Sequence, residues 1–310
     1  MPIPEPAKMG YSYDWQEVER FVSSLRRPVF GAAAAPLRDT GKGKTVLLHK
    51  HLEKVAGQFR VHHQTIGDCV SHGWGLAVDI LKAVEISLHG EREAWTAETA
   101  TEPIYAFSRV EVGGGRLGNG DGSIGAWAAR AVAEYGTLLR QKYGRNDLRR
   151  YSGNRARTWG RRGAGVPDEL EPTSRQHPVR TVSLVTSYED ARDAIANGYP
   201  VPVCSNQGFR DRRDSQGFAK ASGSWAHCMC FVAVDDQKKR PGLLCVNSWG
   251  PHWINGPKRH GQPDGSFWVD ADTVDRMLRR DPDSYSVSGF EGYPDNSDTL
   301  TNSDFLNVWR

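Results

Sequence analysis

Residues 67–88 read GDCVSHGWGLAVDILKAVEISL, and this stretch decides the first half of the fold. Its apolar residues recur about every 3.6 positions, which predicts a helix with one buried face. Cys69 directly follows Gly67 and Asp68, so we expect its sulfur at or within the first turn of that helix. There the helix dipole and the free backbone N–H groups favour a thiolate. The position alone leaves open whether Cys69 is a nucleophile or a structural cysteine.

Further helices and strands are predicted from short patterns in other segments. Helical patterns occupy residues 14–25, 123–135, with Ser123 as N-cap, and 187–197, with a capping box at its start. Short segments rich in β-branched or aromatic residues predict strands at 199–204, 228–234, 242–246 and 266–269. Helices that precede strands indicate an α+β chain with two halves.

The composition excludes several classes of protein. The 310 residues include 40 Lys+Arg and 37 Asp+Glu, a net charge of +3, which argues against a protein that binds polyanions over its whole surface. No stretch approaches the roughly 20 consecutive apolar residues of a membrane helix. The start, Met1 to Gly10, lacks the pattern of a secretory signal, so we expect a cytoplasmic location.

The cysteines are few and odd in number, which predicts free thiols instead of a disulfide framework. They are Cys69, Cys204, Cys228, Cys230 and Cys245. Zinc is the alternative use of Cys228 and Cys230, but their C-x-C spacing lacks the usual gap of two to four residues. We expect these two as small buried hydrophobes, and we expect no metal and no cofactor.

The second half holds a histidine and an asparagine in matching positions. His227 begins one predicted strand, and Asn247 follows the end of the next. Antiparallel pairing would bring the imidazole and the carboxamide side by side. In a thiol hydrolase the imidazole takes the thiol proton, and an amide oxygen holds the ring by accepting its other N–H. The ordered set Cys69, His227 and Asn247 therefore points to nucleophilic catalysis.

These residues and their neighbours resemble the papain-like cysteine peptidases, over roughly Val61 to Phe290. The similar segments are Gln64–Cys69, Asp121–Ser123, Trp225–His227, Asn247–Gly250 and Gly265–Trp268. Asn-Ser-Trp-Gly after a strand is the most specific of them. The glutamine lies one residue closer to the cysteine than is usual in the family, and Val70 stands where a tryptophan usually follows.

The resemblance implies a papain-like two-lobed α+β fold, in which a helical lobe is followed by an antiparallel β lobe and the active-site cleft lies between them. It divides the chain into an N-terminal extension (1–60), a helical lobe (61–180) and a β lobe with a C-terminal tail (181–310). The implied activity is that of a cysteine-type peptidase, and the implied partner is a peptide or protein substrate.

The resemblance also implies a role for each matching residue. Cys69 would attack the carbonyl, His227 would move the proton, and Asn247 would orient the imidazole. The Gln64 amide and the backbone N–H of Cys69 would stabilise the oxyanion. Three further residues would line or protect the cleft, with Asp121 and Gly122 along the substrate and Trp249 over the His227–Asn247 bond.

Two other functions remain open on the sequence. The shortened loop at Gln64 and the extension before Val61 also suit a papain-like scaffold that serves as a structural or binding module in an assembly. Acyl transfer or amide hydrolysis on a non-protein substrate would use the same three residues.

The basic run 140–162, with Asp147 as its single acid, is either a nucleic-acid surface or a solvated arginine-rich loop.

Overall fold

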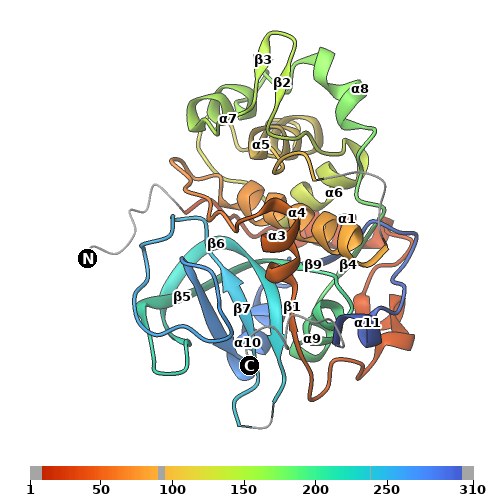
Figure 1. Ribbon diagram of the computed structural model, residues 1–310. Coiled ribbons are helices and arrows are strands. Elements are labelled where there is room, and N and C mark those ends of the chain that lie inside the picture. The colour runs from red at the N-terminus through yellow and green to blue at the C-terminus, as the bar shows by residue number, and fades with distance from the viewer. Residues whose placement is uncertain (1–8, 90–94, 238, 302–310) are drawn as a thin grey trace.

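The computed structural model describes residues 9–89, 95–237 and 239–301. Residues 1–8, which make up most of the segment on which the expected location depends, lie outside the described part. Its helices and strands separate into two lobes, with α4 to α8 above the large sheet in the view of Figure 1. The predicted α+β fold, a helical lobe followed by an antiparallel β lobe, is confirmed.

The helical lobe is built around α4 (Cys69–His89), the helix that the 3.6-residue period predicts. Most of its apolar face is buried, since Trp74, Ala77 and Ile80 have no exposed surface. The other elements of this lobe are α5 (Thr101–Phe107), α6 (Gly125–Glu134), α7 (Gly153–Gly160), α8 (Glu171–Ser174) and a small hairpin of β2 (Lys142–Tyr143) and β3 (Asn146–Asp147).

Helix α6 begins two residues later than predicted, and Ser123 is not its N-cap. The backbone of Ser123 is extended and paired instead, because its N–H donates to the Gly10 carbonyl at 2.7 Å and its carbonyl accepts the Ser12 N–H at 2.9 Å. The helix is capped from a distant segment, since the Gly125 N–H donates to the Asp283 carboxylate at 2.8 Å. This carboxylate supplies the acceptor that the sequence pattern assigned to Ser123.

The main sheet has the strand order β1-β6-β7-β8, and β5 also pairs with β6. Strands β7 (Gly242–Val246) and β8 (Ser266–Asp270) match their predictions to within one residue. Strands β5 (Val201–Arg213) and β6 (Ala219–Asp235) are much longer than predicted. Their added halves form a polar hairpin whose register shifts break the period-2 alternation on which the prediction depends.

Three helices and a small strand pair complete this lobe. Strands β4 (Thr181–Leu184) and β9 (Tyr285–Ser288) pair with each other, and the helices are α9 (Tyr188–Ala196), α10 (Ala271–Arg280) and α11 (Ser297–Thr301). Helix α9 begins as predicted, because the Ser187 hydroxyl accepts the backbone N–H of Asp190 at 3.1 Å.

The residues before position 60 contribute to both lobes. They form α1 (Trp15–Ser24), α2 (Phe30–Ala33), β1 (Thr45–Leu47) and α3 (Leu48–Ala56). Helix α1 packs on α6, where the Glu17 carboxylate accepts the indole N–H of Trp127 at 2.7 Å. Strand β1 pairs with the end of β6. The domain boundaries at 60 and 180 stay a prediction. Within the described ranges, none of the helices is both long and apolar enough to cross a membrane.

Candidate active site

The Cys69 thiol lies at the N-terminal end of α4 and is completely buried between the lobes. Burial is the largest influence on the Cys69 thiol and raises its pKa. Hydrogen bonding by the backbone N–H groups of Cys228 and Gly10 favours the thiolate and lowers the pKa by less. Close approach of α4 to β6 depends on Gly73, where a Cβ atom would lie 2.8 Å from the Met229 carbonyl oxygen. The fold thus places Cys69 beside Cys228, the residue that follows His227.

His227 and Asn247 are brought together as the strand pairing predicts. The His227 Nε2 atom lies 2.7 Å from the Asn247 Oδ1 atom, and that oxygen also accepts the backbone N–H of Ser248 at 2.7 Å. Since Oδ1 is an acceptor only, Nε2 carries the hydrogen and Nδ1 keeps the lone pair. Burial lowers the pKa of His227 to about 4, although the bond to Asn247 raises it. The imidazole is therefore neutral at physiological pH.

Trp249 covers this histidine. The two rings lie 4.5 Å apart between centroids, with an interplanar angle of 34°. Trp225 and Trp253 pack edge-on against Trp249, at centroid distances of 4.8 and 5.4 Å. The three indoles exclude water from one side of the His227 ring, which strengthens the hydrogen bond to Asn247.

Gln64 links the cysteine loop to the asparagine loop. Its Oε1 atom accepts the Ser248 hydroxyl at 2.5 Å, its Nε2 atom donates to the Ile66 carbonyl at 2.8 Å, and its backbone N–H donates to the Ser248 carbonyl at 2.8 Å. The side chain is fully buried. One amide hydrogen is committed to Ile66, so the role of Gln64 as an oxyanion donor stays a prediction.

Asp121 and Gly122 lie next to the cysteine loop. The Asp121 carboxylate accepts the Gly67 N–H at 3.3 Å and forms an ion pair with Arg157 at 2.6 Å. The hydrogen bond and charge of Arg157 hold the pKa of Asp121 below its usual value despite partial burial. The Gly122 carbonyl accepts the buried guanidinium of Arg109. These bonds fix the glycine segment against the loop that carries Cys69.

Solved structures share this fold, whereas comparisons of the sequence give no match. No protein-family model matches the sequence, and no curated protein matches it either. Among solved structures, xylellain, a cysteine protease from Xylella fastidiosa, matches 93% of this chain and 94% of its own, with a TM-score of 0.54 at 14% identity. The chain has the papain-like fold.

Two further solved structures are similar over most of the chain. Digestive procathepsin L 3 from Tenebrio molitor larval midgut matches 92% of this chain and 84% of its own, with a TM-score of 0.48 at 13% identity. Procathepsin B S9 from Trypanosoma congolense matches 95% of this chain and 85% of its own, with a TM-score of 0.47 at 12% identity.

The papain-like fold here contains a buried polar network that the sequence motifs do not reveal. Asp68, directly before Cys69, accepts the Tyr151 hydroxyl at 2.9 Å and lies 3.5 Å from the Nε2 atom of His72. The Nδ1 atom of His72 lies 3.2 Å from the Nδ1 atom of His62. The network anchors the N-terminal turn of α4. Only the acidic neighbour of the cysteine hinted at it.

The structure also describes the basic run 140–162 and the remaining cysteines. Many arginines of the run form ion pairs. Arg140 and Arg155 pair with the buried Glu102, and Arg145 pairs with Glu169. All five cysteines are free and buried. In the described ranges, no cluster of three or more His, Cys, Asp or Glu side chains is arranged to hold a metal ion.

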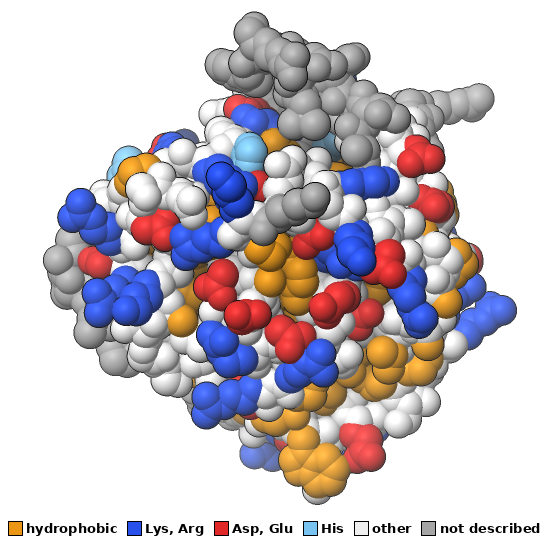
Figure 2. Space-filling view, turned by 90° about the horizontal axis from the view of Figure 1, so that it is seen from below, with side chains coloured by type: hydrophobic (Ala, Val, Ile, Leu, Met, Phe, Trp, Pro, Cys, Tyr) orange, Lys and Arg blue, Asp and Glu red, His pale blue; other side chains and the backbone are white. Residues whose placement is uncertain are grey.

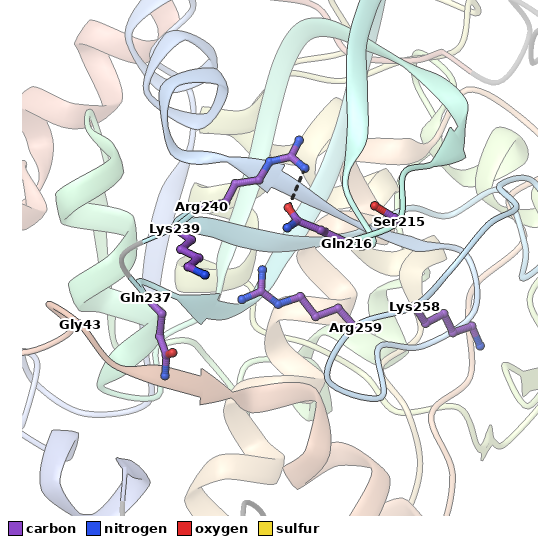
Figure 3. A pocket seen from close by; sticks show the side chains of 8 residues that line it. All are labelled: Gly43, Ser215, Gln216, Gln237, Lys239, Arg240, Lys258 and Arg259. Atoms are coloured by element: carbon purple, nitrogen blue, oxygen red, sulfur yellow. Dashed lines mark hydrogen bonds between the residues drawn. The ribbon is translucent and has the colours of Figure 1, made fainter.

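A second concave region, here called the basic hollow, lies where the loops at both ends of β6 meet residues 258–259. It encloses about 720 Å³ and is lined by Gly43, Ser215, Gln216, Gln237, Lys239, Arg240, Lys258 and Arg259 (Figure 3). Arg240 pairs with Asp214 at 2.5 Å, Lys258 with Asp264 at 2.5 Å, and Arg259 with Asp235. Cationic and acidic side chains are likewise interspersed on the face shown in Figure 2.

Proposed function

We propose that this chain is a thiol hydrolase of the papain-like type, and that it cleaves peptide bonds through Cys69, His227 and Asn247. The observation that carries the proposal is the His227–Asn247 hydrogen bond of 2.7 Å, whose direction is fixed by the Ser248 N–H. It leaves the lone pair of His227 on Nδ1. This atom is buried without a hydrogen-bond partner among the described residues, so the Cys69 thiol is not hydrogen-bonded to it in the resting chain and must approach it for the proton to move. A general base needs such an unoccupied lone pair.

The proposed reaction moves one proton back and forth. The Cys69 thiol gives its proton to Nδ1 of His227, and the sulfur forms a bond to the carbonyl carbon of the substrate. The imidazolium keeps its Nε2–H on Asn247 and returns the Nδ1 proton to the leaving amine as the C–N bond breaks. A water molecule then hydrolyses the thioester, with His227 as the base, and regenerates the thiol.

Two groups are available to stabilise the oxyanion. The backbone N–H of Cys69 belongs to the first turn of α4, where backbone donors lack intrahelical partners. The Gln64 amide lies on the same loop and is held by Ser248 and Ile66. Donors that are held in place before the reaction stabilise the developing charge without reorganisation.

A catalytically silent scaffold is the second candidate. The observation that favours it is the complete burial of Cys69, which raises the pKa of the thiol. A thiol in this state is a poor nucleophile. The two candidates therefore differ in whether the cleft opens.

The experiment is incubation of the full chain with a mixed peptide library, followed by mass spectrometry of the products. We expect cleavage by the unchanged chain, loss of cleavage in Cys69→Ala, and cleavage within about twofold of the unchanged chain in Cys245→Ala, which alters another buried thiol. Products that persist in Cys69→Ala would contradict the proposed nucleophile. Absence of products from every variant would favour the scaffold.

A further inference from the structure

Three of the five buried cysteines lie together beside the proposed catalytic histidine. The Cys204 thiol of β5 donates a hydrogen bond to the Cys228 sulfur of β6 at 2.8 Å. The backbone N–H of Cys228 in turn donates to the Cys69 sulfur, and among the nearby ionisable groups Cys228 has the largest electrostatic effect on Cys69. Cys228 is therefore a neighbour of both Cys204 and Cys69.

The strand pairing places Cys204 and Cys228 at the spacing that a disulfide needs. They lie directly opposite each other in the antiparallel β5–β6 pair. The Cys204 N–H donates to the Ser284 hydroxyl at 3.1 Å and the Cys228 N–H to the Cys69 sulfur, so neither is directed across the pair. In such a non-hydrogen-bonded pair the Cα atoms lie about 4.5 Å apart. Disulfides join Cα atoms that are roughly 4.4 to 6.8 Å apart, so these two sulfurs can bond without large backbone movement.

The side chain of Cys228 also touches the helix that begins with Cys69. A Cβ atom at Gly73, one turn after Cys69, would lie 3.0 Å from the Cys228 sulfur and 2.8 Å from the Met229 carbonyl oxygen. The absence of a side chain at Gly73 thus makes room for this sulfur. Cys228 therefore packs against the first turns of α4, next to Cys69.

The hydrogen bond between the two thiols gives them different roles. Burial raises the pKa of Cys204, and the hydrogen bond to Cys228 raises it further. Cys204 thus keeps its proton, and the hydrogen bond that it donates favours the thiolate of Cys228. The thiolate is the form that attacks an oxidised sulfur. Cys228 is therefore the thiol of this pair that reacts first.

The remaining two cysteines are arranged differently. In the β6–β7 pair, Cys230 lies opposite Val246 and Cys245 lies opposite Phe231. The Cys245 thiol donates to the Met229 sulfur at 3.6 Å, and a thioether cannot form a disulfide. Cys245 is therefore a suitable control for substitutions at Cys204 and Cys228.

We propose that Cys204 and Cys228 form a dithiol redox site that returns Cys69 to the thiol after oxidation by a peroxide. The inference rests on the proposed function in one respect, because the same opening of the cleft must admit the peroxide to Cys69. The product is a Cys204–Cys228 disulfide between β5 and β6. A thiol or a small dithiol reduces this disulfide again and restores the resting chain.

The proposed sequence has three steps. Hydrogen peroxide oxidises the Cys69 thiol to a sulfenic acid and releases one water. The Cys228 sulfur attacks the sulfenic sulfur, and a second water leaves as the Cys69–Cys228 disulfide forms. Cys204 then attacks the Cys228 sulfur, and its proton passes to the departing Cys69 sulfur. In total two thiols lose two electrons and two protons, and one peroxide becomes two waters.

The first test treats the reduced full-length chain with one equivalent of hydrogen peroxide. The protein is then denatured in iodoacetamide, and its cysteines are mapped by mass spectrometry. We expect a disulfide that joins Cys204 to Cys228, together with an alkylated Cys69. A disulfide at another pair, oxidised Cys69 beside reduced Cys204 and Cys228, or five unoxidised cysteines would each overturn the proposal.

The second test separates the steps with substitutions and about ten equivalents of peroxide. In Cys204→Ala we expect the sequence to stop at the Cys69–Cys228 disulfide. In Cys228→Ala the sulfenic acid has no partner, so the fraction of Cys69 found as sulfinic acid should rise at least tenfold over that of the unchanged chain. Cys245→Ala should stay within about twofold of the unchanged chain. Equal sulfinic acid at Cys69 in all four proteins would overturn the role of the pair.

Both tests read masses, so they are independent of turnover. The first needs no substitution and decides the proposal even if a variant fails to fold. If the Cys204–Cys228 disulfide forms and Cys69 is recovered as a thiol, but no peptide is cleaved, the redox site stands and the proposed hydrolase is wrong. If the chain cleaves peptides but Cys69 stays oxidised after one equivalent of peroxide, the hydrolase stands and the redox site fails.

Discussion

The cleft around Cys69 and the basic hollow hold ionisable side chains in opposite ways. In the cleft, Cys69 and His227 are completely buried and their partners are neutral amides and backbone N–H groups. In the hollow, Arg240 and Lys258 keep 34% and 40% of their side-chain surface exposed and are paired with carboxylates. Burial beside neutral partners keeps groups uncharged, whereas exposed opposite charges cancel. Substitutions in the cleft should therefore change the catalytic activity. Substitutions in the hollow should change little except the salt dependence of stability.

The largest difference is expected between two histidines. His227→Ala removes the proposed base and should lower kcat/KM for a cleaved peptide by at least about 10³-fold. His260, which pairs with Asp235 beside the hollow at 2.8 Å, is the matched control, and His260→Ala should change kcat/KM by less than about threefold. Similar losses in both variants would break the contrast between the two regions.

A smaller loss of activity is expected at Asn247. In Asn247→Ala the imidazole remains but loses the acceptor that fixes its tautomer, so kcat/KM should fall by about 10²-fold. Asn146→Ala, at a partly exposed amide that bonds only to Glu169 in the described structure, should leave kcat/KM unchanged. Steady-state kinetics on one peptide measure both. An unchanged kcat/KM in Asn247→Ala would remove this residue from the mechanism.

A buried acid on α4 extends the comparison to stability. Asp79 accepts the backbone N–H and the hydroxyl of Thr99 on one oxygen, at 2.8 and 2.6 Å, and its burial raises its pKa to about 7. The folded state thus holds a proton that the unfolded state releases at about pH 4, so this stabilisation is lost as the pH rises from about 4 to 7.

Asp79→Asn keeps both hydrogen bonds and removes this titration. The free energy of unfolding of Asp79→Asn, relative to that of the unchanged chain, should rise by about 2 to 4 kcal/mol between pH 4 and pH 8. Urea unfolding at both pH values measures it. Asp168→Asn, at an exposed carboxyl, is the control and should show no such trend. A pH-independent difference for Asp79→Asn would mean that the buried carboxyl titrates normally.

The smallest effect is expected in the hollow. The Lys258–Asp264 pair is 2.5 Å long but exposed on both sides. Lys258→Gln should change the free energy of unfolding by less than about 1 kcal/mol, and 1 M salt should abolish even that difference. A loss of several kcal/mol, or one that persists in salt, would show that the hollow is held together more tightly than its exposure indicates.

Local patterns in the sequence predicted the elements whose own residues specify them. Helix α4 follows from its apolar period, α9 from the hydroxyl of Ser187, and β7 from its apolar run. The His227–Asn247 pair also followed, because β6 and β7 pair directly, although His227 lies within the long strand β6 and not at its start as predicted. In these cases the decisive contacts lie within a helical turn or between neighbouring strands.

Features that depend on contacts between residues far apart in the sequence could not be predicted. Nothing near Ser123 indicates that Gly10 and Ser12 occupy its backbone, and nothing near residue 125 indicates a cap from Asp283. Several cations of the basic run 140–162 are paired with acids that lie outside the run, such as Glu102. The sequence did not predict the hollow either, since its cations come from two separate loops, one after β6 and one between β7 and β8.

Strand β1 has a consequence for proteolysis. It pairs with Ala233 to Asp235 of β6, and it follows residues 10–12, whose backbone is hydrogen-bonded to Ser123 and Ala226. A cut soon after Ser12 would separate residues 10–12 from the rest of the chain and leave this pairing intact. A cut beyond Leu47 would also strip a strand from β6 and expose its unpaired N–H and C=O groups, which is a known route to aggregation. Proteolytic removal of all residues through Leu47 would therefore expose an unpaired strand edge on β6.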